Sequence, residues 1–344
     1  MVKARGWARV HDGVSRMSDA GTPRVGVGRR RRLRRAVGWM VGIGFVGVAC
    51  AEIGARLLGL GDPPLYVLDL EVEYLLKPSQ ECRPLGNRFV VNSRSMRSGE
   101  FPAAKASSDE LRVLVLGDSI VNGGVKIDQV ALATELLPAL LQEKLGRPVV
   151  VGNASAGSWG PPNEMAYLKK FGVVSADVVV LVLNSGDVED VPGLEAIGPQ
   201  WPRHRPALAL LELGERKLPG VLGRLTGNAA AAGPSHRPDA ATDGAAVRRS
   251  ITAIAEVVRA AGAKPVAVLY STRSELEAAP ARELATLKDW LSEAGVPVIE
   301  TRDRFAGRAG LFQADGVHPT PDGQAALADV LAAAVERAMT PIAP

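Results

Sequence analysis

A serine and a histidine of the kind that carry out nucleophilic catalysis occur far apart in this 344-residue chain. Ser119 ends the sequence GDS after a short apolar run, and a glycine turn there would leave its hydroxyl at the start of a helix. His318 ends the sequence DGVH, in which Asp315 can reach the ring Nδ1–H and leave Nε2 free to accept a serine proton. Each motif alone also fits a helix cap or a capping loop. Together they predict catalysis if the fold brings them to one place.

The elements around these residues alternate between strands and helices. Apolar runs of strand length occur at 111–116, 148–152, 176–183, 265–270 and 297–300. Helical spacing of apolar residues occurs at 130–145, 164–171, 245–261, 276–294 and 322–339. This alternation predicts a three-layer α/β/α sandwich around a five-stranded parallel sheet. Functional groups of such sheets gather beyond the carboxyl ends of the strands, so Ser119 and His318 are expected at one edge.

These motifs resemble those of the SGNH, or GDSL-type, serine hydrolases over about residues 111–340. The specific blocks are GDSI, which contains Ser119, and DGVHP, which contains Asp315 and His318. The resemblance implies a flavodoxin-like fold and an activity among esterases, lipases and some acyltransferases. It also implies that Ser119 is the nucleophile, that His318 is the base and that Asp315 orients the histidine.

The same resemblance implies an oxyanion hole, a set of N–H donors that stabilises the negatively charged intermediate. Its first donor is the backbone N–H of Ser119. The second is a glycine N–H after the second strand, which is either Gly157 or Gly160. We favour Gly157, although the family spacing falls on Ser158.

The third family block, G-x-N-D, departs from the family pattern in this chain. It aligns with NSGD at 184–187 and puts Gly186 where the asparagine donor is expected. Asn184 lies two residues earlier, on the same face of a strand, and is the candidate replacement. The alternative is a hole of two backbone donors, and losing one donor lowers rates by about 10²–10³. That alternative fits a weak enzyme or a non-catalytic binding protein.

The N-terminal region has the pattern of a membrane anchor. Six arginines cluster at 29–35, and the apolar stretch that follows is interrupted only near its end, by Glu52 and Arg56. A helix over 36–60, at about 1.5 Å per residue, is long enough to cross a hydrocarbon core of about 30 Å. The arginines predict a signal anchor with residues 1–35 in the cytoplasm and the rest outside. A cleaved signal peptide, a lipoprotein signal and a buried core helix are the alternatives.

Beyond this transmembrane segment we expect a connector at 61–108 and a hydrolase domain at 109–344. The domain contains an insertion at 188–244 with seven prolines, which is either a functional lid or partly unstructured. A short helix is expected within it at 207–213. The low-complexity end, 227–244, is expected to be dispensable, whereas the earlier part is expected to shape the substrate pocket.

Charge and composition exclude several classes of function. Residues 1–35 hold 11 of the 41 Lys and Arg residues and two acidic residues, so the rest has 30 basic against 35 acidic. A body with this acidic excess is not expected to bind nucleic acid. Two cysteines exclude a disulfide scaffold and cysteine-based zinc sites. The sequence contains no phosphate loop, metal cluster or dinucleotide fingerprint, so no cofactor or metal is expected.

The sequence thus predicts a serine ester hydrolase anchored in the cytoplasmic membrane by one helix, with its catalytic domain on the extracytoplasmic side. Its expected substrates are O-acyl esters of a glycan, a glycolipid or a lipid. The alternatives are an O-acyltransferase that acts on an envelope glycan and a catalytically weak SGNH-fold binding protein. The sequence does not predict the substrate or the oligomeric state.

Overall fold

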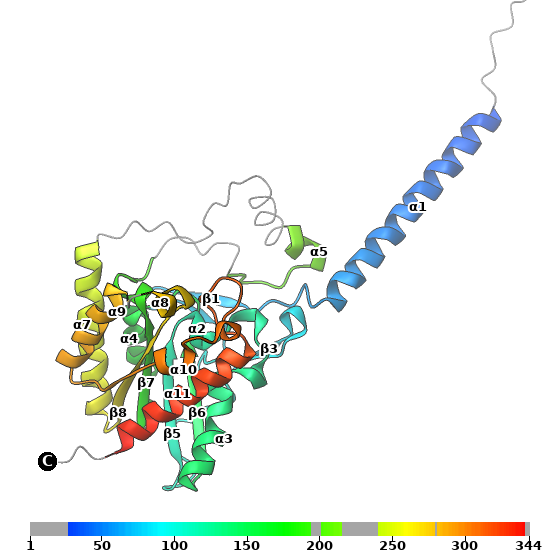
Figure 1. Cartoon of the computed structure of the whole chain (residues 1–344). Coiled ribbons are helices and arrows are strands. Elements are labelled where there is room, and N and C mark those ends of the chain that lie inside the picture. The colour runs from blue at the N-terminus through cyan, green and yellow to red at the C-terminus, as the bar shows by residue number, and fades with distance from the viewer. Residues whose placement is uncertain (1–26, 194–200, 215–239, 279–280, 341–344) are drawn as a thin grey trace, which may run out of the picture. The chain divides into compact units, whose positions relative to one another are not determined.

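The computed structural model describes residues 27–193, 201–214, 240–278 and 281–340 (Figure 1). The chain divides into two compact units, residues 1–50 and 51–344, and each is considered by itself.

The first unit contains most of the helix α1 (Val27–Leu57), which continues into the second unit. Its part from Arg31 to Leu57 is long and apolar enough to cross a membrane, and its large apolar side chains are exposed. It is the one helix of this kind in the part of the chain that the structure describes. By length and composition this is the helix that the sequence predicted as an anchor. A signal sequence would share both properties.

The second unit is built on a five-stranded parallel sheet in the order β6-β5-β7-β8-β9. Its strands are β5 (Leu111–Gly117), β6 (Val149–Ser155), β7 (Val178–Asn184), β8 (Lys264–Tyr270) and β9 (Val298–Glu300). In this order β5, the first of the five sheet strands along the chain, lies between β6 and β7, the second and third, as in flavodoxin-like folds. The central strands are apolar on both faces because helices cover both. The predicted fold class is therefore confirmed.

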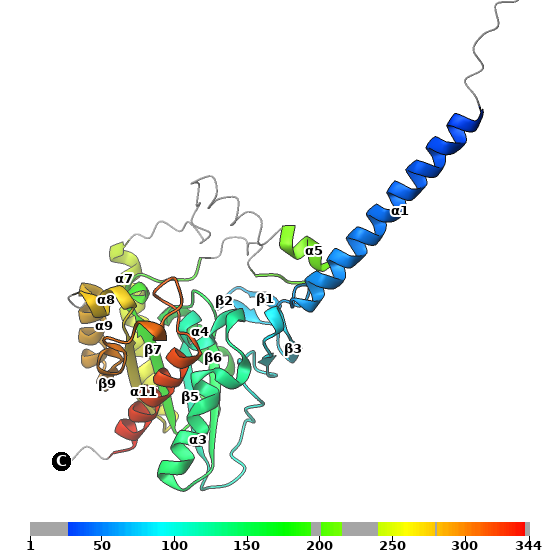
Figure 2. The ribbon, with the colours of Figure 1, turned by 45° about the vertical axis from the view of Figure 1, so that its right-hand side comes forward.

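Two helical layers enclose the sheet (Figures 1 and 2). Val113 and Val115 of β5 pack in one hydrophobic cluster with residues of α3 (Ala133–Leu145) and α11 (Pro321–Met339). Leu114 and Leu116 point the other way and pack with residues of α4 (Pro161–Phe171), α7 (Ala240–Ala260) and α9 (Arg282–Glu293). Short elements complete the unit: α2 (Ser119–Asn122), α5 (Ala209–Glu212), α8 (Arg273–Glu277), α10 (Arg302–Phe305), and the 3-10 helices η1 (Pro84–Gly86), η2 (Gly124–Lys126), η3 (Gln129–Ala131), η4 (Ser185–Val188) and η6 (Ala309–Leu311).

Two predicted helices differ in extent from those observed. The expected helix at 276–294 is two helices, α8 and α9, separated by residues 278–281, and Pro280 disfavours a continuous helix there. The helix α7 begins at Ala240, inside the expected insertion, so a deletion of 227–244 would remove its first residues. The earlier part of that stretch, 227–239, lies outside the described residues. The short helix expected at 207–213 is α5.

The connector at 61–108 contains two antiparallel hairpins, which were not predicted from the sequence. Its strands are β1 (Tyr66–Asp69), β2 (Glu73–Leu76), β3 (Gln80–Cys82) and β4 (Phe89–Val91).

A buried arginine attaches this connector to the chain that follows α2. The Arg97 guanidinium donates to the backbone carbonyls of Asn122, Gly124 (2.6 Å) and Ile127 (2.7 Å). It also lies 4.0 Å from the centre of the Phe89 ring. Burial lowers the pKa of Arg97 to about 9. The connector therefore holds the segment directly after the predicted nucleophile.

Candidate active site

The turn between β5 and α2 positions Ser119. A Cβ at Gly117 would lie 2.6 Å from a methyl of Val121, so only glycine fits the end of the strand. Asp118 caps the helix, because its Oδ1 accepts from the backbone N–H of Ile120 at 2.8 Å. Ser119 is the first helical residue, and the structure gives its backbone N–H no acceptor among the described residues.

The loop before α11 brings a histidine to this serine. His318 Nε2 lies 3.0 Å from Ser119 Oγ, and its Nδ1 lies 3.0 Å from Asp315 Oδ2. The loop is fixed from two sides: the Tyr270 hydroxyl donates to the Val317 carbonyl (2.8 Å), and the chain before the loop pairs with its end. The structure therefore brings together the three residues that the sequence singled out from two distant motifs.

Asp315 is held in its ionised form. Partial burial alone would raise its pKa, but the backbone N–H groups of His318 and Val317 and the His318 ring outweigh this effect. The result is a pKa of about 2. A carboxylate in this position keeps the proton of His318 on Nδ1 and leaves Nε2 as the acceptor that faces Ser119.

The two glycines after β6 differ in what their N–H groups do. Gly160 caps the start of α4, and its N–H donates to Asn163 Oδ1 at 3.0 Å, while Asp190 packs where its side chain would be. Gly157 has open space around it, and within the described residues its N–H has no acceptor. Its loop is anchored by Trp159, whose buried indole N–H donates to the Tyr74 carbonyl at 3.2 Å. Gly157 is thus the glycine with a free donor.

Asn184 ends β7 at the same edge of the sheet, but carboxylates occupy its amide group. Its Nδ2 lies 3.1 Å from Asp118 Oδ2 and 3.2 Å from Asp187 Oδ2, and its Oδ1 accepts from the Gly186 N–H. As an oxyanion donor, Asn184 stays a prediction that requires the amide to leave these two carboxylates. Gly186 is exposed, and among the described residues the only atom near a Cβ built on it is Asn184 Oδ1 at 3.0 Å.

Four carboxyl groups on this side of Ser119 share a buried environment. Burial raises the pKa of Asp118 to about 6 although the Ile120 N–H and His318 lower it, and burial with Asp118 nearby raises that of Asp190 to about 7. Burial, and then Asp118, also raise the pKa values of Asp187 and Glu164 well above their usual range. These acids therefore tend to hold protons, in contrast to Asp315.

Sequence reasoning missed Glu164 and Asp190. A signal for Glu164 was present: it lies three residues after Pro161 and four before Leu168, on the buried face of α4. A carboxyl on an apolar face indicates a special environment.

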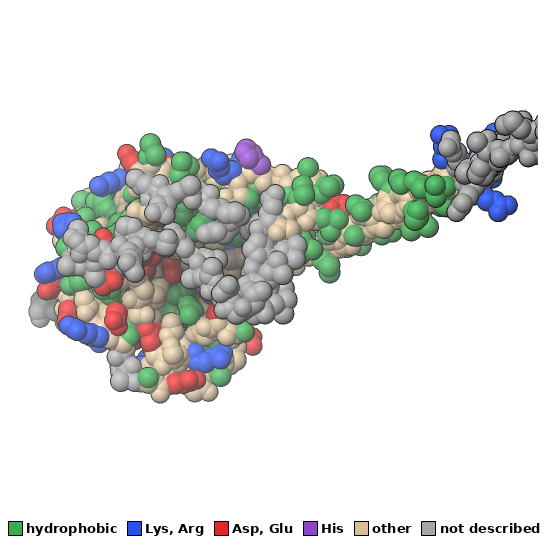
Figure 3. Space-filling view, turned by 90° about the horizontal axis from the view of Figure 1, so that it is seen from above, with side chains coloured by type: hydrophobic (Ala, Val, Ile, Leu, Met, Phe, Trp, Pro, Cys, Tyr) green, Lys and Arg blue, Asp and Glu red, His purple; other side chains and the backbone are tan. Residues whose placement is uncertain are grey.

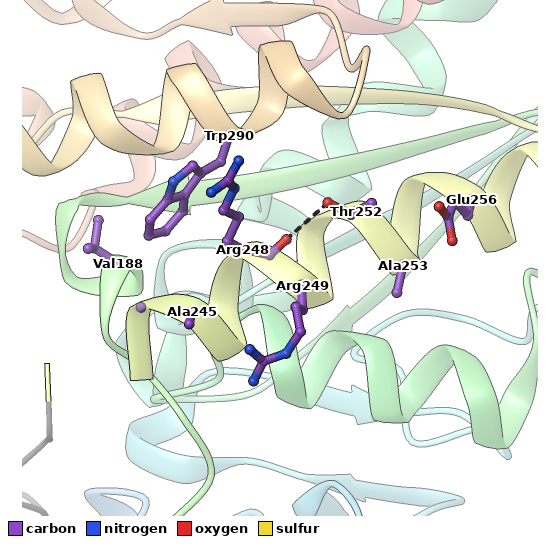
Figure 4. Close-up of a pocket in the computed structure, with 9 residues that line it drawn as sticks. Val188, Ala245, Arg248, Arg249, Thr252, Ala253, Glu256 and Trp290 are labelled. Atoms are coloured by element: carbon purple, nitrogen blue, oxygen red, sulfur yellow. Dashed lines mark hydrogen bonds between the residues drawn. The ribbon is translucent and has the colours of Figure 1, made fainter. Parts of the chain in front are cut away.

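No group of three or more His, Cys, Asp or Glu side chains in the described part of the chain could hold a metal ion. A surface hollow of about 670 Å³ lies along α7, where Arg248 and Trp290 point toward one another (Figure 4). Its lining includes Val188 at the end of η4 but none of the three residues joined at Ser119.

The chain was compared with known proteins in three ways. A search of curated protein sequences found no match. Solved structures with a related fold include TesA, with 18% identity and a TM-score of 0.43 over 66% of this chain and 99% of that one. They also include the psychrotrophic esterase EstA from Pseudoalteromonas sp. (14%, TM-score 0.40, 66% and 97%) and a lipase/acylhydrolase from Enterococcus faecalis (15%, TM-score 0.40, 68% and 100%). The profile of the GDSL-like Lipase/Acylhydrolase family matches residues 115–326, more than half of the chain. This chain, with GDS at the end of its first sheet strand and DGVH before its last helix, belongs to the GDSL-like lipase/acylhydrolase family.

Proposed function

We propose that this protein is a membrane-anchored serine esterase that hydrolyses O-acyl esters. The observation that carries the proposal is the continuous hydrogen-bonded chain from Asp315 through His318 to Ser119. Each contact has a length suited to proton transfer, and Asp315 is held ionised.

The reaction follows from these contacts. Ser119 Oγ attacks the ester carbonyl carbon while its proton moves to His318 Nε2. The tetrahedral intermediate collapses, the leaving alcohol takes that proton, and the acyl group remains on Ser119. Water then repeats the sequence: His318 takes a proton from it, the acid leaves, and the proton returns to Ser119. Asp315 stays ionised throughout and stabilises the charged imidazolium.

The oxyanion donors that we assign are the backbone N–H groups of Ser119 and Gly157, because both are free of other acceptors within the described residues. Asn184 could add a third donor only by leaving Asp118 and Asp187. A hole of two donors predicts a modest rate, since each donor contributes about 10²–10³.

The membrane location rests on α1. We assign residues 1–35 to a cytoplasmic tail and 36–60 to the transmembrane anchor, because six arginines precede the apolar stretch. We also assign 61–108 to the connector and 109–344 to the extracytoplasmic hydrolase domain. The substrate is then an acyl ester of a glycan, glycolipid or lipid within reach of the extracytoplasmic face of the cytoplasmic membrane.

Labelling of the full-length protein with a fluorophosphonate probe tests the nucleophile. We expect the wild type to be labelled and Ser119→Ala to lose both labelling and hydrolysis of a small activated ester. Ser185→Ala, in η4 near the same edge, is the matched control and should keep both. Labelling that survives in Ser119→Ala would place the nucleophile elsewhere.

A reporter enzyme fused after Pro344 tests the orientation. An exported reporter that functions only outside the cytoplasm should be active in this fusion. Activity of a reporter that works only in the cytoplasm would overturn the assigned topology.

A further inference from the structure

We infer that the second unit carries its own membrane-binding surface, the bilayer seat, formed by exposed leucines and a neighbouring basic pocket. The inference rests on the proposed membrane anchoring but not on the proposed chemistry. It assigns to the segment 201–214, and to residues near the end of α1, the task of binding the outer lipid surface.

The leucines of the seat are concentrated in one place. Among the described residues after Ile53, nine large apolar side chains are exposed, and six of these belong to this surface. They are Leu57 (82% exposed), Leu58 (71%), Leu211 (46%), Leu208 (44%), Leu85 (42%) and Leu213 (39%). A cluster of exposed apolar side chains of this kind marks an interaction site. Figure 3 shows hydrophobic side chains around the end of α1 that belongs to the second unit.

Hydrogen bonds connect the end of α1 to the segment 207–210 of the seat. Glu52 accepts from the backbone N–H groups of Ala209 (2.8 Å) and Leu210 (3.1 Å), and Arg56 donates to the Ala207 carbonyl (3.2 Å). The charged pair that interrupts the apolar sequence therefore binds the start of α5. The leucines of this segment are presented by a fixed scaffold.

Further hydrogen bonds connect the turn after α1 to α5 and to Leu85. The backbone N–H of Gly61 donates to Glu212 Oε2 at 2.6 Å, and the Gly59 carbonyl accepts from the Leu85 N–H at 2.9 Å. Gly59 has a φ of +76°, and a Cβ there would lie 2.3 Å from the Gly86 nitrogen. Glycine is thus required for Leu85 to lie beside the end of α1.

A basic pocket of about 520 Å³ is lined in part by residues 203–205, which precede Leu208 by a few positions in the chain. Arg205, four residues before Ala209, is fixed in it by Asp62 (2.9 Å) and the Glu81 carbonyl (3.2 Å). The pocket is lined by Leu65, Lys77, Ser79, Gln80, Glu81, Arg203, His204 and Arg205. In the described part of the chain, the side chains of Lys77 and Arg203 have no ion pair or hydrogen bond. They are therefore available to an anion.

The bilayer is the occupant that fits both parts of this surface. Leu57 and Leu58 lie at the end of the proposed transmembrane segment, 36–60, so the seat is continuous with that segment along the chain. Apolar side chains beside free cations match the boundary between acyl chains and anionic phospholipid headgroups. A protein partner would have to bind beside the helix at the depth where lipid headgroups already lie.

Fluorescence quenching in lipid vesicles tests the leucine part. Full-length protein with Cys50→Ser and Leu211→Cys, labelled with an environment-sensitive dye, is reconstituted in phospholipid vesicles; Cys82 is buried. Nitroxide groups at headgroup depth should quench this dye several-fold more than a dye at Glu143→Cys, at the exposed end of α3. Equal quenching at the two positions would overturn the seat.

The basic pocket is tested by varying the lipid charge. Adding an anionic phosphatidylglycerol to neutral phosphatidylcholine vesicles should increase quenching at position 211. The double variant Lys77→Glu/Arg203→Glu should lose this increase, whereas Arg337→Glu, an exposed arginine at the end of α11, should keep it. An unchanged increase in the double variant would overturn the role of the pocket. Suppression of the increase by inorganic phosphate at constant ionic strength would instead assign the pocket to a small soluble anion.

Two measurements on the same vesicles separate this inference from the proposed function. Retention of the protein after an alkaline wash shows that the anchor is inserted, and fluorophosphonate labelling reports Ser119. Normal retention without quenching at position 211 refutes the seat alone. Quenching without labelling refutes the proposed chemistry and leaves the seat standing.

Discussion

The two sides of Ser119 use the same residue type in opposite ways. On one side, the loop at 315–318 holds a partly exposed aspartate whose pKa is lowered to about 2 by N–H donors. On the other side, the stretch 184–190 and its neighbours hold carboxyls whose pKa values are raised by burial. The first side has several donors for one carboxylate, whereas the second shares the amide of Asn184 between two.

The two sides of the candidate site therefore differ in how well they are equipped for the proposed reaction. The side with His318 has the charge and the contacts that a general base requires. The side with Asn184 has a shared amide instead of a free donor, and glycine at position 186. The comparison therefore predicts an enzyme that activates its nucleophile well and stabilises the oxyanion with backbone groups only.

The largest expected effect comes from Asp315→Asn. The amide favours the wrong tautomer of His318, so kcat should fall by about 10⁴ without loss of the fold. Hydrolysis of a small ester, with circular dichroism as a check of folding, measures this. Asp322→Asn, an exposed residue of the first turn of α11, is the control and should stay near wild type. A decrease in kcat of less than tenfold would mean that the 315–318 loop does not supply the general base.

Gly186→Asn, on the side of Ser119 that contains Asn184, should increase kcat instead of lowering it. Position 186 is exposed and its φ is not in the left-handed region. In the part of the chain that the structure describes, only Asn184 Oδ1 lies close to the added Cβ. The expected gain in kcat from an added amide that donates to the oxyanion is up to about 10²–10³. Gly186→Ala adds the Cβ without the amide and should give no gain. Equal rates in both variants would show that no donor is missing.

Asn184→Ala distinguishes a shared structural amide from an oxyanion donor. The structure predicts a loss of about 1–3 kcal/mol in the free energy of unfolding, because buried acceptors of Asp118 and Asp187 lose their partner. That loss should be smaller in the background Asp187→Asn, as urea unfolding would show. If kcat instead falls by about 10²–10³ with stability unchanged, Asn184 is the displaced donor.

The smallest effect concerns the pH dependence of stability. Burial, and then the nearby carboxylates, raise the pKa of Asp190 from 3.8 to about 7, so the folded state binds this proton more tightly. Its contribution to stability is therefore complete below about pH 3.8 and is lost as the pH rises through 7. Tm should fall less between pH 5 and 8 in Asp190→Asn than in the wild type, with Asp322→Asn as control. Parallel curves would contradict the raised pKa.

Most of the sheet and the hydrogen-bonded set at Ser119 could be predicted because each rests on local patterns. Buried parallel strands are short apolar runs, and GDS and DGVH lie directly at strand and helix boundaries. The position of Asn184 at the carboxyl end of β7 was predictable from the apolar run that precedes it. Its partners were not, because hydrogen bonds to Asp118 depend on how β5 and β7 pair.

Other features could not be predicted because they depend on distant contacts. The first hairpin is an example, because the alternation of apolar and acidic residues from Leu68 to Tyr74 runs across its turn and does not mark two strands. The connector that contains this hairpin is fixed by Arg97, whose partners lie more than 20 residues away. In the sequence Glu52 is only a charge near the end of the apolar stretch, whereas in the structure it accepts from the first backbone N–H groups of α5.

Tyr74 lies between two tryptophans that belong to different parts of the second unit. Its ring is 5.2 Å from that of Trp201, in the segment of the bilayer seat, and its carbonyl holds Trp159, two residues after Gly157. If lipid contact changes ligand binding at the Gly157 loop through Tyr74, ligand binding there must change lipid binding by the same free energy, since binding linkage is reciprocal. A phosphonate bound at Ser119 would then change the affinity of the seat for lipid by the same factor by which lipid changes phosphonate binding.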